Sequence, residues 1–368
     1  IAVGGALGGA LCSLVAPLVF DRVAEYPLAL VALAFLVAVP PGAGAGSTRP
    51  AARRPAASAW VPAAAMAALA AVTANRLAYA PPAERANWLV VAPLLLAYGA
   101  ALARRPGRFG LAAALFALVH ATGFAASQNV VAQERGFFGV LRVRETSTTR
   151  ALLHGTTMHG TQPIGATADE LRRPGGYYHP EGPLGRPLAE LGADADIGIV
   201  GLGTGALAAV ARPGQRLVYY EIDPLVERLA RAHFGYLAAS PADVRVVLGD
   251  GRLALESAPD GAFDLLVVDA FTSDAVPVHL LTAEALDLYL RKTAPEGLVV
   301  LHVSNRHLDL ARVLYGYAED RGAPMAYALW EPSAAAAAEG AAWTEAVALS
   351  PSPERLAAVL ARPPWRPR

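Results

Sequence analysis

The sequence predicts an α-helical transmembrane region, followed by a small β domain and an α/β domain built on a parallel sheet. Three observations lead to this fold class. Uncharged apolar segments fill the first 128 residues, alternating apolar and polar residues follow them, and strand-like and helix-like segments alternate from Ile197 onward. The last pattern is typical of a parallel sheet with helices on both faces.

The composition agrees with a membrane-embedded part. Hydrophobic residues make up 54% of the 368 residues and charged residues only 17%, whereas roughly a quarter of the residues in a soluble domain are charged. The formal net charge is zero, so the chain has no overall field that would attract nucleic acid, and we expect no nucleic-acid partner.

Five apolar segments predict a transmembrane region at 1–128. A helix needs about 20 apolar residues to cross the hydrocarbon core, and segments rich in Ala and Gly suit close helix packing in lipid. Buried helices of a soluble protein are the alternative, which five successive segments argue against. Because the chain begins with Ile1 inside an apolar run and has no initiator methionine, we expect it to be the C-terminal part of a longer protein, or a processed one. The segments are 1–20, 27–48, 58–75, 86–103 and 109–128.

Arginines in the loops bear on the orientation of this region. They concentrate in 47–55 and 104–108. If the last three segments span the membrane, both loops lie on the side opposite the following domain. The positive-inside rule would then place that domain outside the cytoplasm.

The pattern of apolar and polar residues after position 128 predicts a succession of strands and helices. Residues 137–145 alternate as a strand does, and 148–162 read as a second strand and a turn, so we place a small β domain at 129–190. The α/β domain follows at 191–350, with a C-terminal tail at 351–368. Its strand candidates are 197–201, 216–223, 244–250, 263–271 and 297–305, and its helix candidates are 224–235, 279–292 and 308–321.

The stretch IVGLGTGALAAV, 199–210, predicts a nucleotide-binding turn between a strand and a helix. Gly201, Gly203 and Ala206 fit the G-x-G-x-x-G/A fingerprint, and Glu221 lies where dinucleotide-binding proteins carry an acid for the ribose. NAD is therefore permitted. The glycine loop, however, contains no basic residue to meet a pyrophosphate.

The acids at the ends of the next strands favour an adenosyl sulfonium ligand over a dinucleotide. Glu221 can accept both ribose hydroxyls, Asp250 and Gly251 can read an adenine edge, and Asp269 and Asp274 lie beyond the following strand. A sulfonium is cationic and carries no phosphate, so surrounding carboxylates are favourable.

Some of these acids have simpler structural roles. Asp223 precedes a proline and is most simply a helix N-cap, and Asp250 could also be one. Asp274 could cap a helix or remain solvated. Asp269 follows four apolar residues and has no obvious capping role, which makes it the principal catalytic candidate.

Taken together, GLGTG, YYEIDP, LGDGR and DAFTSD resemble the spermidine synthase (aminopropyltransferase) family over about 130–310. Residues 4–30 resemble the membrane part of its membrane-fused, spermidine synthase-like members. The resemblance implies a small β domain followed by a Rossmann-like, methyltransferase-type domain. The family transfers an aminopropyl group from decarboxylated S-adenosylmethionine to a polyamine amine and releases methylthioadenosine.

The resemblance also implies roles for individual residues. Asp269 would receive the proton of the attacking amine, Tyr178 would be the tyrosine at the gate between the two domains, and Asp274 is a third catalytic candidate. It implies an inner or plasma membrane protein with a cytoplasmic catalytic domain, against the loop arginines, and allows a homodimer. The residues expected to bind the adenosyl co-substrate are Gly201, Gly203, Thr204, Gly205, Glu221, Ile222, Asp250 and Gly251.

The chain departs from the family pattern at several acids. Thr204 replaces the glycine-loop aspartate that holds the aminopropyl ammonium, and His154 replaces the aspartate of an L-D-G turn. His154, His159 and His179 are therefore candidates to line the substrate pocket in place of acids. Their spacing matches no known zinc pattern, so we predict no metal.

Three functions remain open on this basis. The first is a membrane-bound aminopropyltransferase-like enzyme whose partners are the adenosyl sulfonium, a polyamine or other amine, and the lipid bilayer. The second is a methyltransferase or lyase acting on intact S-adenosylmethionine, whose carboxylate the neutral Thr204 would tolerate. The third is a sensor or transporter whose domain binds the ligand without chemistry.

Overall fold

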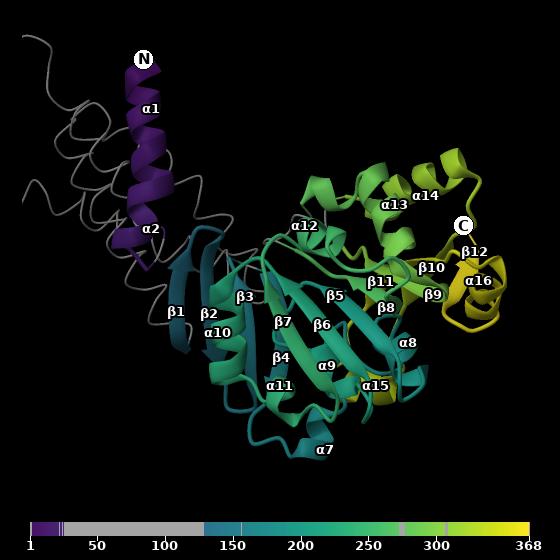
Figure 1. The fold of residues 1–368 in the computed structure, drawn as a ribbon. Helices are drawn as coiled ribbons and strands as arrows, with labels where there is room; N and C mark the ends of the chain where they lie inside the picture. Colours follow the sequence, from purple (N-terminus) through teal and green to yellow (C-terminus); the bar gives the residue numbers. More distant parts are fainter. Residues whose placement is uncertain are drawn as a thin grey trace, which may run out of the picture. The chain divides into compact units, whose positions relative to one another are not determined.

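The computed structural model describes residues 2–21, 23, 25, 129–155, 157–271, 277–305 and 308–367. The chain divides into two compact units, Ile1–Val130 and Val131–Arg368. The described helical elements of the first unit follow one another without a break (Figure 1). They are α1 (Ala2–Ala10), the π-helical η1 (Leu11–Val15) and α2 (Ala16–Val19).

Within the described residues, the helix Ala2–Val19 is long and apolar enough to cross a membrane, with a mean hydropathy of 1.9 over 18 residues. A signal sequence near an N-terminus has the same properties, so one such helix is weak support for a membrane region. The other four predicted segments lie outside the described residues. The five-segment transmembrane region therefore stays a prediction.

The predicted small β domain contains a four-stranded sheet in the order β1-β2-β3-β4. Its alternating pattern turns Leu141, Val143 and Leu152 inward, where they join the hydrophobic core that also covers the second sheet. Residues 148–162 hold most of two strands, and β1 lies ahead of the strand predicted at 137–145. The strands are β1 (Val130–Gly136), β2 (Gly139–Glu145), β3 (Thr149–His154) and β4 (Thr157–Pro163).

The second sheet has eight strands in the order β12-β10-β11-β9-β8-β5-β6-β7. The five strands predicted from the sequence, β5 to β9, pair in parallel. They are β5 (Asp196–Val200), β6 (Arg216–Glu221), β7 (Asp243–Leu248), β8 (Phe263–Val268) and β9 (Thr293–His302).

The sheet is mixed and not parallel throughout, because the remaining three strands pair antiparallel. Strand β11 (Thr344–Leu349) pairs with β9, and β10 (Ala326–Trp330) pairs with β11 and with β12 (Trp365–Pro367). Between β10 and β11 the chain forms only the five-residue helix α15 (Ala334–Ala338), and antiparallel neighbours need no crossover helix.

Residues 351–368, expected as a tail, carry regular structure within the described part of the chain. They contain α16 (Pro353–Leu360) and β12, which forms one edge of the second sheet. Leu356 and Trp365 are buried. The α/β fold therefore continues beyond position 350.

Helices cover both faces of the second sheet, as Figure 1 shows. One hydrophobic core contains side chains of α8, α9, α10, α11 and α16, and the other contains side chains of α12, α13 and α14. These helices are α8 (Gly185–Glu190), α9 (Ala206–Val210), α10 (Pro224–His233), α11 (Tyr236–Ala239), α12 (Gly251–Glu256), α13 (Ala283–Lys292) and α14 (Leu310–Arg321). A further short helix, α7 (Ala168–Leu171), follows β4.

The glycine turn after β5 brings three chain segments close together. Gly201 has φ +100° and Gly203 has φ +54°, in the region that favours glycine. A Cβ at Gly201 would collide with the carbonyl oxygen of Asp269, and one at Gly203 would lie 2.8 Å from the carbonyl oxygen of His159. The turn therefore needs glycine both for its dihedral angles and for its close contact with β4 and β8.

We expect Gly201→Ala to lower the free energy of unfolding by about 3 kcal/mol, because it combines backbone strain with a collision against backbone atoms. Gly322 is the matched control, since it also has a positive φ, of 61°, but a Cβ there meets nothing within 4 Å. Gly322→Ala should cost about 1 kcal/mol. Urea denaturation measures both, and equal losses would show that the contact with Asp269 is unimportant.

Candidate active site

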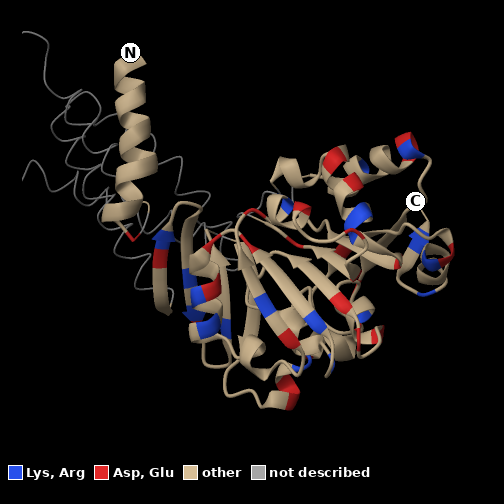
Figure 2. Ribbon diagram, viewed as in Figure 1, with Lys and Arg blue, Asp and Glu red and all other residues tan. Residues whose placement is uncertain are grey.

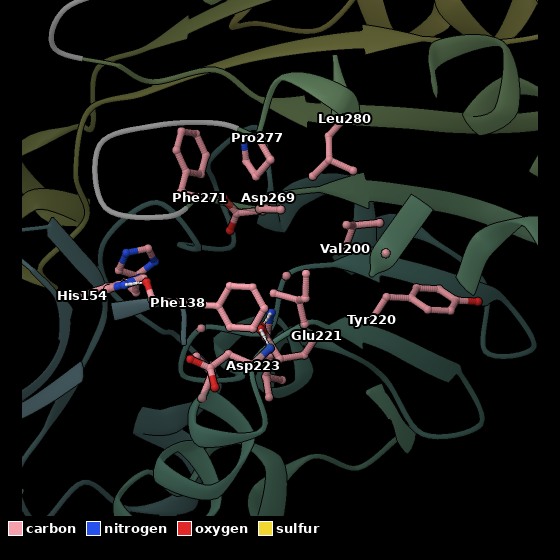
Figure 3. A pocket seen from close by; sticks show the side chains of 18 of the residues that line it. Phe138, His154, Val200, Tyr220, Glu221, Asp223, Asp269, Phe271, Pro277 and Leu280 are labelled. Atoms are coloured by element: carbon pink, nitrogen blue, oxygen red, sulfur yellow. Dashed lines mark hydrogen bonds between the residues drawn. The ribbon is translucent and has the colours of Figure 1, made fainter. Parts of the chain in front are cut away.

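A cavity lies at the carboxyl edge of the parallel strands. There β5 has β6 on one side and β8 on the other, which is the kind of switch point where open α/β sheets bind ligands. Its empty volume, with open solvent at the mouth included, is about 790 Å³. Figure 3 shows Asp269 and Phe271 on one side of the cavity and Glu221 and Asp223 on the other, with the Phe138 ring between them.

Glu221 is held in place by backbone N–H groups at the end of β6. Its Oε2 accepts the N–H of Leu202 and its Oε1 accepts the N–H of Asp223, each at 2.9 Å. Burial raises the pKa of Glu221, and the hydrogen bonds from Asp223 and Leu202 partly offset this rise. Each carboxylate oxygen keeps a further lone pair, so the predicted ribose contact is chemically available.

Asp250 follows β7 and lines the cavity, and its two carboxylate oxygens each have a hydrogen-bond partner. Its Oδ1 accepts the N–H of Leu253 at 3.0 Å, which caps α12, and its Oδ2 lies 3.0 Å from Nε2 of His279. The capping role and the cavity position therefore coexist in one side chain. Gly251 also lines the cavity, where a Cβ would lie 2.5 Å from Cγ1 of Val200.

The predicted glycine-loop residues divide into two groups. Gly201 and Gly203 line the cavity, as does Ile222 on the next strand end. Thr204 and Gly205 are not among the lining residues that the structure describes. Thr204 is fully buried beneath β4, where its Oγ1 would lie 2.5 Å from a Cβ at Gly160. Its hydroxyl faces the small sheet.

Asp269, the principal catalytic candidate, lies at the end of β8 between two other buried side chains. Its Oδ1 is 2.7 Å from Nδ1 of His302. Burial, with the charge of the nearby Asp269 next in importance, raises the pKa of Tyr178 well above its ordinary value. Asp274, the third catalytic candidate, lies outside the described residues.

Two of the three candidate histidines reach the cavity. His154 and His159 line it, with ring centres 5.7 Å apart, and Nε2 of His154 lies 2.8 Å from the carbonyl oxygen of Phe138. Because a carbonyl only accepts, that nitrogen carries the proton. His179 is buried elsewhere, beside Glu339 at 3.1 Å and stacked on Trp330.

The electrostatic character of the cavity is strongly acidic. Four carboxylates line it, those of Glu221, Asp223, Asp250 and Asp269, whereas no Lys or Arg occurs among the described lining residues. Asp223 caps α10 through a 2.9 Å hydrogen bond from the N–H of Leu225, as predicted. Such a surface suits a cation and opposes a phosphate.

Sequence reasoning missed several residues that contact the cavity or its acids. Pro277, His279 and Leu280 line the cavity beside Asp250. The helix predicted at 279–292 begins only at Ala283, and Val278–Leu280 form a 3-10 turn instead. Thr282 was the available signal, since its side chain caps α13 by accepting the N–H of Ala285 at 3.3 Å.

The fold and site define a class: an α/β protein with a small β sheet ahead of its main sheet in the chain and an acidic cavity at the switch point. No protein-family model matches the chain. The chain is 27% identical over 187 residues to a probable polyamine aminopropyl transferase of Bifidobacterium longum, covering 50% of this chain and 40% of that protein. It is 33% identical over 93 residues to a polyamine aminopropyltransferase of Vibrio vulnificus, covering 24% of this chain and 30% of that protein.

Solved structures show similarity of the same kind. A probable spermidine synthase from Corynebacterium glutamicum matches with a TM-score of 0.46 and 18% identity, over 64% of this chain and 90% of that one. The spermidine synthase of Thermotoga maritima matches with a TM-score of 0.46 and 13% identity, over 62% and 75%. The chain is thus similar to the polyamine aminopropyltransferases, and its alignments span less than half the length of the curated relatives.

Proposed function

We propose that the chain is an aminopropyltransferase-like enzyme that binds decarboxylated S-adenosylmethionine, transfers its aminopropyl group to an amine and releases methylthioadenosine. The observation that carries this proposal is the charge of the cavity, with four carboxylates and no described lining Lys or Arg. A sulfonium nucleoside is the ligand class that this surface favours. The curated relatives are named for the same transfer.

The residues present fit such a nucleoside. Glu221 can accept ribose hydroxyls, Asp250 can accept from an adenine amino group, and Leu280 and Pro277 provide apolar surface beside it. Intact S-adenosylmethionine carries an α-carboxylate, and the described lining offers it no Lys or Arg partner. This favours the decarboxylated donor. Thr204, whose neutrality admitted intact S-adenosylmethionine, does not line the described cavity.

The proposed reaction is a direct displacement. The acceptor nitrogen forms a bond to the aminopropyl carbon attached to sulfur, the carbon–sulfur bond breaks, and its electron pair neutralises the sulfonium to a thioether. The attacking amine must first be unprotonated, because an alkylammonium with a pKa near 10.4 is mostly charged at neutral pH. Asp269 would receive that proton, and Tyr178 would hold its carboxylate toward the cavity.

The acceptor is proposed to be an amine of low charge. A polyamine needs several carboxylates along its length, whereas the described wall formed by the small sheet presents Phe138, Leu141, Leu152, His154 and His159. These side chains are apolar or carry an imidazole. An acceptor with one ammonium group and an apolar chain suits this wall better than a fully extended polyamine does.

Product analysis tests the donor. We expect purified protein to release methylthioadenosine from decarboxylated S-adenosylmethionine only when an amine such as putrescine or a longer monoamine is present, with products identified by mass. Methylthioadenosine from intact S-adenosylmethionine alone would instead indicate a lyase, and adenosylhomocysteine would indicate methyl transfer. Ligand binding without any product would leave a binding protein and refute the enzyme.

A further inference from the structure

His302 and Asp269 form a buried pair at the floor of the site. Strands β8 and β9 run in parallel with Val268 opposite Leu301, so the next residues of the two strands, Asp269 and His302, emerge side by side. Nδ1 of His302 lies 2.7 Å from Oδ1 of Asp269, and the two side chains are only 4% and 8% exposed.

The chemistry of the two groups fixes where the proton lies. An ionised carboxylate only accepts hydrogen bonds, so Nδ1 of His302 must carry the proton and donate it to Asp269. This N–H therefore restrains the Asp269 side chain, as a third residue restrains the imidazole in a catalytic triad.

The surroundings of His302 leave its second ring nitrogen without a described hydrogen-bond partner. Its Nε2 is buried, and within the described structure it has no hydrogen-bond partner. A proton there would leave a charged donor unsatisfied away from water, which is costly. The rings of Tyr177 and Phe271 pack against the imidazole, with centres 4.7 and 5.0 Å away.

We propose that His302 is a positioning residue for the transfer reaction: its Nδ1–H anchors one oxygen of Asp269, so that the carboxylate meets the incoming amine in a fixed orientation. This inference rests on the proposed function. A positioning role accounts for the buried side chain of His302. This side chain contacts the proposed base Asp269, although His302 is not among the residues that line the cavity.

Two substitutions test the role of the imidazole. His302→Leu removes the donor, whereas His302→Asn keeps an N–H close to the position of Nδ1. We expect His302→Leu to lower the rate of methylthioadenosine release from saturating donor and amine about a hundredfold. His302→Asn should stay within about tenfold of the wild type, and methylthioadenosine affinity measured by calorimetry should change less than about twofold in both.

The proposal would be overturned if His302→Leu kept the wild-type rate. Parallel losses of rate and nucleoside affinity would also overturn it, because they would indicate a merely structural role. His302→Asn keeps the test valid if the leucine variant does not fold.

A measurement that needs no catalytic turnover tests the positioning role of His302 independently of the proposed function. We expect a proton NMR signal for the His302 Nδ1–H, downfield of the amides in wild-type protein and missing in both variants. If that signal is absent from the wild type, His302 does not pair with Asp269 and the positioning role is excluded. If it is present in a wild type that turns over no donor, the pair stands and the proposed function fails.

Discussion

Asp269→Asn should lower methylthioadenosine release about a thousandfold, which is the range that a general base contributes. An amide has nearly the shape of the carboxylate but cannot take the proton of the attacking amine. The amide would also face the Nδ1–H of His302. Its oxygen can accept this hydrogen bond, whereas its NH₂ group would place a second donor there. A single-turnover assay with decarboxylated donor and saturating amine gives the rate directly.

The control for this substitution lies on the same strand. Asp264 is near the opposite end of β8, where its Oδ2 accepts the N–H of Asp196 at 2.9 Å, and it is not among the residues lining the cavity. Asp264→Asn should keep the wild-type rate. Methylthioadenosine should bind the Asp269→Asn variant with nearly wild-type affinity, because the base faces the amine and not the nucleoside. Turnover that survives in Asp269→Asn would assign the proton to another acceptor.

The acids of the site could be predicted from the sequence because their positions follow from strand ends. Glu221, Asp250 and Asp269 each come within a few residues of the last apolar position of a parallel strand, and all such ends meet at one edge of the sheet. The glycine turn was predictable for a similar reason, since the chain must leave β5 in a conformation that only glycine adopts easily. The local sequence pattern was therefore sufficient to predict the acids and the glycine turn of the site.

The partners of those acids could not be predicted, because they depend on pairing between segments distant in sequence. His302 meets Asp269 only through the register of β8 and β9, and His279 meets Asp250 only because the segment before α13 forms a 3-10 turn. Thr204 illustrates the same limit. Its position in the glycine loop suggested a ligand contact, but the missing side chain of Gly160 on β4 lets it pack beneath the small sheet.

The edge strands β10 to β12 were missed for a different reason. No strand was predicted after 297–305, because β12 has only three residues and both β10 and β11 contain two alanines, which are depleted in strands. These strands lie on the far side of β9 from the cavity-bearing β8 and β5. Their omission therefore left the predicted site intact.

Glu221→Gln should weaken methylthioadenosine binding roughly thirtyfold, which corresponds to about 2 kcal/mol for hydrogen bonds to a charged group. In the wild type both carboxylate oxygens already accept backbone N–H groups, from Leu202 and Asp223. A glutamine would turn its NH₂ group toward one of these donors, and it would lose the charge that strengthens the ribose contact. Calorimetry measures the affinity, and Glu227→Gln, a partly buried change on α10 outside the described lining, is the control.

The pH profiles of nucleoside affinity and of stability, compared between the wild type and Glu221→Gln, separate the contribution of Glu221 to binding from its contribution to folding. Burial raises the pKa of Glu221 in the folded protein, so the folded state binds its proton more tightly than the unfolded state does. This carboxyl therefore favours folding below its ordinary pKa of 4.5, and that contribution is lost as the pH rises through the raised value. Ribose hydroxyls stabilise the ionised form, so nucleoside affinity should fall as the pH drops through the raised pKa. Glu221→Gln should remove this part of both pH profiles, and an unchanged affinity profile would show that Glu221 does not hold the ribose.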